Sequence, residues 1–498
     1  MSLAPDYTAF EGKYEKGEPQ VVIRRIVSDL ETPVSAYLKL AARRRNTFLL
    51  ESVEGGEKLG RYSIIGLHPD AVWRARGSIA EINRRAATDP LAFEADERPP
   101  LESLRAFIDE SAIEMPSNAP PMGAGVFGFF GYDMARQIER LPNKPRDVLG
   151  VDDALFIRPT LIAVFDNLRQ EILLVATARK EDGVKARRAY DCAAERIENA
   201  VSQLSAPLST GRDAVIAVDP ASIEIHESNT PANEYRTMVE RAKEHIAAGD
   251  IFQAVLSQRF ETPFDRPPIE LYRALRRLNP SPFLFFLDFG EFALVGSSPE
   301  ILVRVRDGEV TIRPIAGTRP RGATKEEDDR LAEELLRDPK ERAEHLMLLD
   351  LGRNDVGRSA EIGSVAVTEK FSIERYSHVM HIVSNVVGEL RSDMHAVDAV
   401  AAGFPAGTVT GAPKIRAMEI IDALERDARG VYGGAIGYFS ADGNVDTCIA
   451  LRTALVKDGI MYVQAGAGVV ADSDPDAEHR ECVNKARALF AAARSALG

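Results

Sequence analysis

Cysteine is scarce in this chain of 498 residues, which contains only Cys192, Cys448 and Cys482. Three widely separated cysteines are too few for a disulfide framework or a zinc site, and they fit a reducing compartment such as the cytoplasm. Residues 1–20 carry many charges and no apolar core, so we expect no secretory signal. No apolar run approaches the roughly 18 residues of a transmembrane helix, so we expect no membrane-spanning segment.

Positive charge is also in deficit. The chain has 62 lysines and arginines against 76 aspartates and glutamates, for a net charge of −14. The molecule as a whole is therefore not expected to attract nucleic acid or an anionic membrane. An anionic ligand would need a local positive group or a metal ion. No string matches a P-loop or a Rossmann turn in spacing and context, so a nucleotide is not expected either.

The chain is too long for one simple hydrophobic core, which indicates two domains or one large composite domain. A looser stretch over residues 206–229, with Pro, Ser, Gly and Thr, is the expected linker between a domain at 20–205 and a domain at 230–498. Apolar runs and helical patterns come in clusters rather than in strict alternation. This arrangement predicts an α+β fold in which helices flank a large, mostly antiparallel β-sheet sandwich.

Hydrophobic periodicity and capping residues predict the individual elements. We expect strands at 48–50, 161–165, 283–287, 292–295, 310–315, 433–438, 447–456 and 461–463. We expect helices at 184–204, at 326–351, at 476–497, and from Thr230 and Pro231 to Gly249.

Two Glu-x-x-Glu steps occur near the two ends of one long segment, Glu341 with Glu344 and Glu478 with Glu481. Residues three apart share a helix face, so each step places two carboxylates side by side. Taken alone, such a step is more often a solvated helix face. If the fold joins the two steps, the four carboxylates would raise one another's pKa values, and a divalent cation such as Mg²⁺ would relieve that cost.

Four strings rich in glycine or proline lie in the same half of the chain, at 296–300, 313–320, 405–414 and 464–468. Glycine lets a ligand approach the backbone, and successive N–H groups can hold an anion. One such string is more often a structural turn. Four of them, beside the glutamate steps and Arg452, predict a site for a small polar anion.

Strings along nearly the whole chain resemble, in order, the large, chorismate-using subunit of anthranilate synthase. They lie at 49–52, 60–63, 279–283, 296–300, 314–318, 343–347, 351–355, 379–381, 405–414 and 484–487. The resemblance implies the fold of chorismate-utilising enzymes, with a regulatory N-terminal domain and a chorismate-binding catalytic domain. It also implies the first step of tryptophan biosynthesis, in which chorismate and ammonia give anthranilate and pyruvate with Mg²⁺ as cofactor.

The resemblance assigns roles to single residues. Glu300 matches the acid that protonates the departing ring hydroxyl, although alone it would read as a surface residue at a strand end. His381 and Thr408 match the active-site histidine and threonine, with His378 as a competitor on the same face. A lone histidine among apolar residues is otherwise more often part of a core.

Metal and substrate contacts are implied in the same way. Glu344 and Glu481 match direct Mg²⁺ ligands, and Glu341 and Glu478 would act through metal-bound water. Arg452 matches the fork that binds the enolpyruvyl carboxylate. The other matched substrate contacts are Tyr432, Gly466, Ala467, Gly468, Lys485, Gly317 and Thr318, and for Lys485 a pairing with a metal ligand remains the alternative.

Two positions separate this chain from related enzymes. Gln253 stands where water-using relatives carry lysine, and a neutral amide cannot act as a general base. Ala316 stands where aminodeoxychorismate synthases usually carry a nucleophilic lysine. Both residues favour anthranilate, with aminodeoxychorismate synthase component I or a non-catalytic binding protein on the same fold as the alternatives.

The resemblance further implies a tryptophan site for feedback inhibition and a separate glutamine amidotransferase subunit that supplies ammonia, because no cysteine here lies in a glutaminase context. Glu51 would pair with the amino group of tryptophan, and aromatic residues would pack the indole. Phe283 replaces the tyrosine common in the family. The matched positions are Glu51, Ser52, Pro282, Phe283, Leu284, Ile436 and Tyr438.

Overall fold

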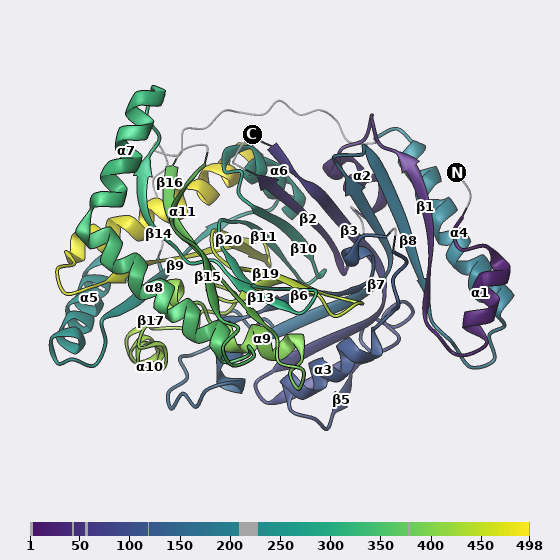
Figure 1. The fold of residues 1–498 in the computed structure, drawn as a ribbon, viewed down its shortest axis with the longest axis horizontal. Coiled ribbons are helices and arrows are strands. Elements are labelled where there is room, and N and C mark those ends of the chain that lie inside the picture. The colour runs from purple at the N-terminus through teal and green to yellow at the C-terminus, as the bar shows by residue number, and fades with distance from the viewer. Residues whose placement is uncertain are drawn as a thin grey trace.

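The structure is a computed structural model that describes residues 3–41, 44–54, 58–117, 119–208, 228–376 and 379–497. Strands and helices alternate irregularly around one large assembly of strands (Figure 1). Every pairing between strands in these ranges is antiparallel. The α+β expectation with a mostly antiparallel sheet is thereby confirmed.

The first part of the chain is mainly sheet. Its elements are α1 (Tyr7–Tyr14), β1 (Gln20–Val27), α2 (Pro33–Leu40), β2 (Thr47–Glu54), β3 (Lys58–Arg76), β4 (Ile79–Asn83), β5 (Glu94–Asp96), α3 (Pro100–Glu110), β6 (Gly125–Phe130), β7 (Ala154–Asp166), β8 (Glu171–Ala178) and α4 (Ala186–Ser205), with short 3₁₀ turns at Pro121–Gly123 and Tyr132–Gln137.

The second part adds the longer helices. Its elements are α5 (Ala232–Ala247), β9 (Gln253–Pro263), α6 (Pro268–Leu278), β10 (Phe283–Asp288), β11 (Phe292–Ser298), β12 (Ile301–Arg306), β13 (Glu309–Ile312), β14 (Ile315–Pro320), α7 (Lys325–Arg337), α8 (Pro339–Gly357), β15 (Ala366–Arg375), β16 (Val379–Glu389), α9 (Ala396–Gly403), a 3₁₀ turn at Gly407–Val409, β17 (Gly411–Ala412), α10 (Lys414–Leu424), β18 (Ala435–Ser440), β19 (Val445–Ile449), β20 (Thr453–Lys457), β21 (Ile460–Val469) and α11 (Pro475–Leu497).

Strands from the two parts are interleaved. β2 pairs with β10, with Leu49 opposite Phe286, and β6 pairs with β18, with Phe129 opposite Ile436. The apolar core follows the same mixing, since Phe127 of β6 packs against Tyr438 of β18 with ring centroids 5.4 Å apart. The division into domains 20–205 and 230–498 stays a prediction, and most of the expected linker, residues 209–227, lies outside the described residues.

Two expected elements are broken in the structure, each for a local reason. The single helix expected at 326–351 is divided into α7 and α8 at Asp338 and Pro339. Proline disfavours the helical conformation in the residue before it, and the Asp338 carboxylate accepts hydrogen bonds from the N–H groups of Lys340 and Glu341 as the N-cap of α8. The strand expected at 447–456 is interrupted between β19 and β20, where Arg452 has a φ of +47°.

Helices cover the sheet where the candidate site residues lie. In Figure 1, α8 runs along β14 and β16, and α11 packs against α6 and β21. No helix among the described residues is long and apolar enough to cross a membrane.

Candidate active site

Glu300 lies in the short connection between β11 and β12, and its side chain is buried. Burial raises the pKa of its carboxyl group to about 8, and the Thr408 hydroxyl and the positive charge of Lys485 only partly oppose this shift. The Thr408 hydroxyl donates a hydrogen bond to Oε1 at 3.1 Å. Glu300 is therefore mostly protonated at neutral pH, the state that a general acid requires.

His381 lies in β16, opposite Thr318 of β14. Its Nδ1 is 2.9 Å from the carbonyl oxygen of Gly317 and 3.1 Å from the Thr318 hydroxyl. A carbonyl oxygen can only accept, so Nδ1 carries the hydrogen and Nε2 is left as the proton acceptor. Burial, together with the charge of Arg452, lowers the pKa of His381. His378 lies outside the described residues.

Arg452 occupies the break between β19 and β20 and is a cation without a carboxylate partner. Its guanidinium makes no ion pair or hydrogen bond within the described part of the chain, and burial lowers its pKa. An unpaired charge that is largely removed from water is costly, and a left-handed backbone strains a residue other than glycine. This arrangement suits an arginine whose carboxylate partner belongs to a bound ligand.

Glycines of β21 leave room for two other predicted site residues. A Cβ atom at Gly466 would lie 2.7 Å from the Tyr432 hydroxyl oxygen, and one at Gly468 would lie 2.6 Å from Nε2 of Gln253. A side chain at Gly466 would also lie 2.9 Å from the Leu256 carbonyl oxygen, and one at Gly468 would displace the Gln253 amide, so glycine keeps both approaches open. Ala467, between them, is buried and pairs with Leu256 of β9.

The four glutamates of α8 and α11 act on one another electrostatically. Burial raises the pKa of Glu344, with further contributions from Glu341 and Glu481, while a hydrogen bond from the Gln253 side chain opposes the shift. Burial and the Glu481 charge raise the pKa of Glu478. Repulsion among these carboxylates favours a cation between the two helices.

Two basic side chains offset part of the negative charge of these glutamates. Arg319 donates to Glu341 at 3.0 Å, and Lys485 is 2.7 Å from Glu481. Lys485 also donates to the carbonyl oxygen of Gly466 at 2.9 Å, so it links a predicted metal ligand to β21. No three acidic, histidine or cysteine side chains of the described ranges are gathered closely enough to hold a metal ion.

Tyr376 is a neighbour of the site that the sequence did not suggest. Its ring meets His381 edge-on with centroids 5.6 Å apart, its hydroxyl donates to Glu374 at 2.8 Å, and its charge state interacts with Arg452 and Glu300. Tyr376 thus contacts His381 and lies close enough to Glu300 and Arg452 to interact with them electrostatically. An aromatic residue five positions before a histidine in a strand carries no signal that could have identified it.

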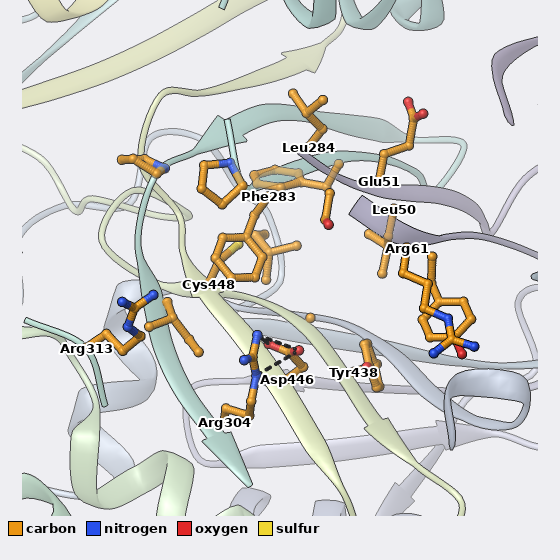
Figure 2. Close-up of a pocket in the computed structure, with 18 of the residues that line it drawn as sticks. Leu50, Glu51, Arg61, Phe283, Leu284, Arg304, Arg313, Tyr438, Asp446 and Cys448 are labelled. Carbon is orange, nitrogen blue, oxygen red and sulfur yellow. Dashed lines mark hydrogen bonds and ion pairs between the residues drawn. The ribbon is translucent and has the colours of Figure 1, made fainter. Parts of the chain in front are cut away.

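A cavity of about 930 Å³ lies beside this site, and all seven residues of the predicted tryptophan site line it (Figure 2). Glu51 is already engaged, because Arg276 donates to both of its oxygens at 2.7 and 3.0 Å and the Tyr272 hydroxyl donates at 2.5 Å. An incoming amino group would have to share that carboxylate. Pro299 and Ile301, on either side of Glu300, also line the cavity, so the two sites share a wall.

Known proteins resemble this chain over nearly its full length. The family model for chorismate binding enzymes matches residues 46–491. The anthranilate synthase component 1 of Cereibacter sphaeroides is 56% identical over 490 residues, which cover 98% of this chain and 97% of that protein. That of Pseudomonas putida is 49% identical over 478 residues, covering 94% and 93%.

Among solved structures, anthranilate synthase component I from Streptococcus pneumoniae is similar with a TM-score of 0.76 at 37% identity, covering 94% of this chain and 99% of its own. Fold and sequence identity therefore agree. The chain belongs to the chorismate binding enzyme family and, within it, to the anthranilate synthase component 1 group.

Proposed function

We propose that the chain converts chorismate and ammonia to anthranilate and pyruvate. The observation that carries the proposal is Glu300, a buried carboxylic acid whose raised pKa, about 8, keeps it protonated at neutral pH. Hydroxide is a poor leaving group, so the reaction needs such an acid at the ring hydroxyl. Relatives named anthranilate synthase component 1, at up to 56% identity, support the choice of product.

In the first step, ammonia adds at ring C2 while Glu300 gives its proton to the C4 hydroxyl, which leaves as water. Thr408 holds the carboxyl group in place through its hydrogen bond to Oε1. Arg452 binds the enolpyruvyl carboxylate with its planar fork, and its burial strengthens that contact. Tyr432 and the glycines of β21 line the space beside the bound acid.

In the second step, Nε2 of His381 accepts the proton from C2. The bond from C3 to the enolpyruvyl oxygen breaks, and the ring becomes aromatic. The departing enolpyruvate takes up a proton at its methylene carbon and becomes pyruvate. Gly317 and Thr318 orient the imidazole by occupying Nδ1. A lowered pKa keeps His381 neutral and therefore able to accept a proton.

We propose Mg²⁺ as the cofactor, with Glu344 and Glu481 as direct ligands and Glu341 and Glu478 acting through water. The all-oxygen donor set and the mutual repulsion of these carboxylates fit such an ion. When bound, the metal would neutralise the ring carboxylate of chorismate. Lys485 pairs with Glu481, and Arg319 pairs with Glu341.

Feedback inhibition by tryptophan in the 930 Å³ cavity is part of the proposal. Ser52→Phe should fill the space beside Phe283 and abolish inhibition while activity without tryptophan is kept. The measurement is the initial rate against tryptophan concentration for both proteins, with Ile79→Ser on the exposed face of β4 as control. A native enzyme that millimolar tryptophan leaves unaffected would remove this site.

We also propose that the enzyme works in the cytoplasm with a separate glutamine amidotransferase subunit. The three cysteines are free, and none lies in a nucleophile context that could hydrolyse glutamine. The chain alone should accordingly use ammonium salts and not glutamine.

The test of the main reaction is to mix the purified chain with chorismate, Mg²⁺ and an ammonium salt at mildly alkaline pH. Anthranilate should appear by its fluorescence, and chromatography should identify it together with pyruvate in equal amount. A product that is only aminodeoxychorismate or isochorismate would overturn the assignment, and unreacted chorismate would favour a binding protein.

A further inference from the structure

A buried ion pair lies behind the candidate site, between α10 and β18. The Arg429 guanidinium donates to Glu425 through Nε at 2.9 Å and through a second nitrogen at 2.5 Å. Both side chains are almost fully buried, with 2% and 4% of their surfaces exposed. Replacing such a pair by apolar residues is often neutral for stability, so its presence is weak evidence of a stabilising role.

The remaining donors of Arg429 reach the backbone of two site segments. One nitrogen donates to the carbonyl oxygen of Val409 at 2.7 Å and another to that of Val255 at 2.7 Å. Val409 directly follows Thr408, whose hydroxyl holds the acid Glu300. Val255 lies in β9, two residues after Gln253.

The same ion pair also reaches the glycine-lined side of the site. The guanidinium carbon lies 5.5 Å from the centroid of the Tyr432 ring. Glu425 accepts hydrogen bonds from the backbone N–H and the hydroxyl of Ser257 at 2.8 and 2.9 Å, and Ser257 is the β-sheet partner of Gly466. The ion pair thus contacts the Tyr432 ring, Val409 beside Thr408, and Ser257 opposite Gly466. The three site residues come from separate stretches of the sequence.

We infer that Arg429, together with Glu425, is a positioning residue that sets the place of Thr408 against Glu300 and of Tyr432 against Gly466. This inference rests on the proposed anthranilate-forming function. Arginine suits the role because its donors are fixed in one plane and point outward in different directions. It can therefore make all four of these hydrogen bonds at once. Lysine offers three donors from a single atom and cannot reach both carbonyl groups and both carboxylate oxygens.

A matched control is available in a neighbouring ion pair, whose carboxylate, Asp427, lies two residues before Arg429. Arg259 pairs with Asp427 at 3.0 Å and donates to the carbonyl oxygen of Ala428 at 3.2 Å. This pair is comparably buried, with 5% and 10% of the side chains exposed, and its partners are not site residues. Arg259→Lys therefore perturbs a buried arginine on β9 whose side-chain hydrogen bonds go to Asp427 and Ala428 and not to Val409, Val255 or Ser257.

The experiment compares steady-state kinetics of the wild-type chain, Arg429→Lys, Arg259→Lys and the double variant Arg429→Met with Glu425→Met, which removes both buried charges at once. We expect kcat to fall about 10- to 100-fold in both Arg429 variants and to change less than about threefold in Arg259→Lys. Melting temperatures measured alongside identify loss of fold.

Two further readouts separate positioning from a structural role. Combining Arg429→Lys with Thr408→Val should cost little beyond either change alone, because both act on one contact. The Thr408 hydrogen bond lowers the pKa of Glu300, which also faces Lys485 and Tyr376. Weakening that bond should therefore move the alkaline limb of kcat to higher pH in Arg429→Lys and not in Arg259→Lys.

Equal loss of kcat in Arg259→Lys and Arg429→Lys, multiplicative losses in the combined variant, or failure of both Arg429 variants to fold while Arg259→Lys folds would each overturn the inference. If the wild-type chain forms no anthranilate, the proposed function falls and the inference with it. If the wild type is active and the Arg429 variants match it, only the positioning role falls.

Discussion

Two buried glutamates show how surroundings decide what the same side chain does. Glu51 is held by both nitrogens of an Arg276 fork and by the Tyr272 hydroxyl, so it is a fixed anchor between β2 and α6. Glu300 has one neutral donor, Thr408, and no cation within ion-pair distance among the described residues. Burial without a paired charge favours the protonated form, and Glu300 is thereby equipped to release a proton.

For Glu300 this gives a prediction with a defined pH dependence. Its carboxyl group is protonated below a pKa of about 8, so its contribution to kcat is present below that pH and is lost as the pH rises through it. Glu300→Gln should lower kcat by about 10²- to 10⁴-fold and remove this alkaline limb. Rates measured across pH, at a fixed concentration of free NH₃, check both parts. A glutamine variant with wild-type turnover would show that another group is the acid.

Arg452 leads to a prediction about stability rather than rate. Its buried guanidinium has no partner in the described structure, so Arg452→Met should leave the melting temperature unchanged or raise it while chorismate no longer stabilises the fold. Arg158→Met is the contrasting variant, because Arg158 pairs with Asp70 at 2.7 Å and with Glu110 at 2.9 Å and its loss should lower the melting temperature. Thermal unfolding with and without chorismate measures both. Wild-type stabilisation by chorismate in Arg452→Met would exclude this clamp.

At the scale of elements, local patterns predicted most strands and helices but not their interruptions. The apolar pattern over 326–351 is helical throughout, and the break between α7 and α8 falls at Asp338, directly before Pro339. The apolar run over 447–456 gives no hint that Arg452 adopts a left-handed conformation within it. Both breaks lie beside predicted functional groups. The first begins the helix that carries Glu341 and Glu344, and the second holds Arg452, the predicted anion clamp.

Residues of the candidate site could be predicted only where they lie in a sequence motif typical of the family. Glu300, His381, Arg452 and the four glutamates were named from the sequence, and the structure brings Glu300 to Thr408 and His381 to Thr318. Tyr376 and Arg429 could not be found in this way. Arg429 reaches the site through backbone carbonyl groups, and Tyr376 meets His381 through a ring contact. Neither kind of contact leaves a trace in periodicity or composition.

Helices α8 and α11 give a prediction about metal binding. Glu344→Gln removes one negative charge from a repelling set, so without divalent cations the variant should be at least as stable as the wild type. The rise in melting temperature on adding Mg²⁺ should be smaller, and Mg²⁺-dependent activity should fall at least tenfold, about the loss of one coordinating contact. Glu333→Gln, on the exposed face of α7, serves as control. An unchanged Mg²⁺ response in Glu344→Gln would remove it from the ligand set.

At the scale of the whole molecule, the interleaved strands make the two parts of the chain dependent on each other. β2 needs β10 and β6 needs β18 to complete their hydrogen bonding. A fragment of residues 1–208 should therefore lack a cooperative unfolding transition, although it contains β1 to β8 and α4. Circular dichroism and calorimetry on the fragment test this, with the full chain as reference. A sharp transition in the fragment would show that residues 20–205 fold as an independent domain.

The pairing of β6 with β18 also bears on how the protein is made. β6 is an apolar strand, and all of its residues, Gly125–Phe130, are buried. One of its edges is covered by β7 soon after synthesis, but the other waits for β18, several hundred residues later. At ribosomal speeds that interval is on the order of tens of seconds, during which the unpaired edge of an apolar strand is open to other nascent chains. Yield on overexpression should thus depend on chaperones that shield this edge until the late strand emerges.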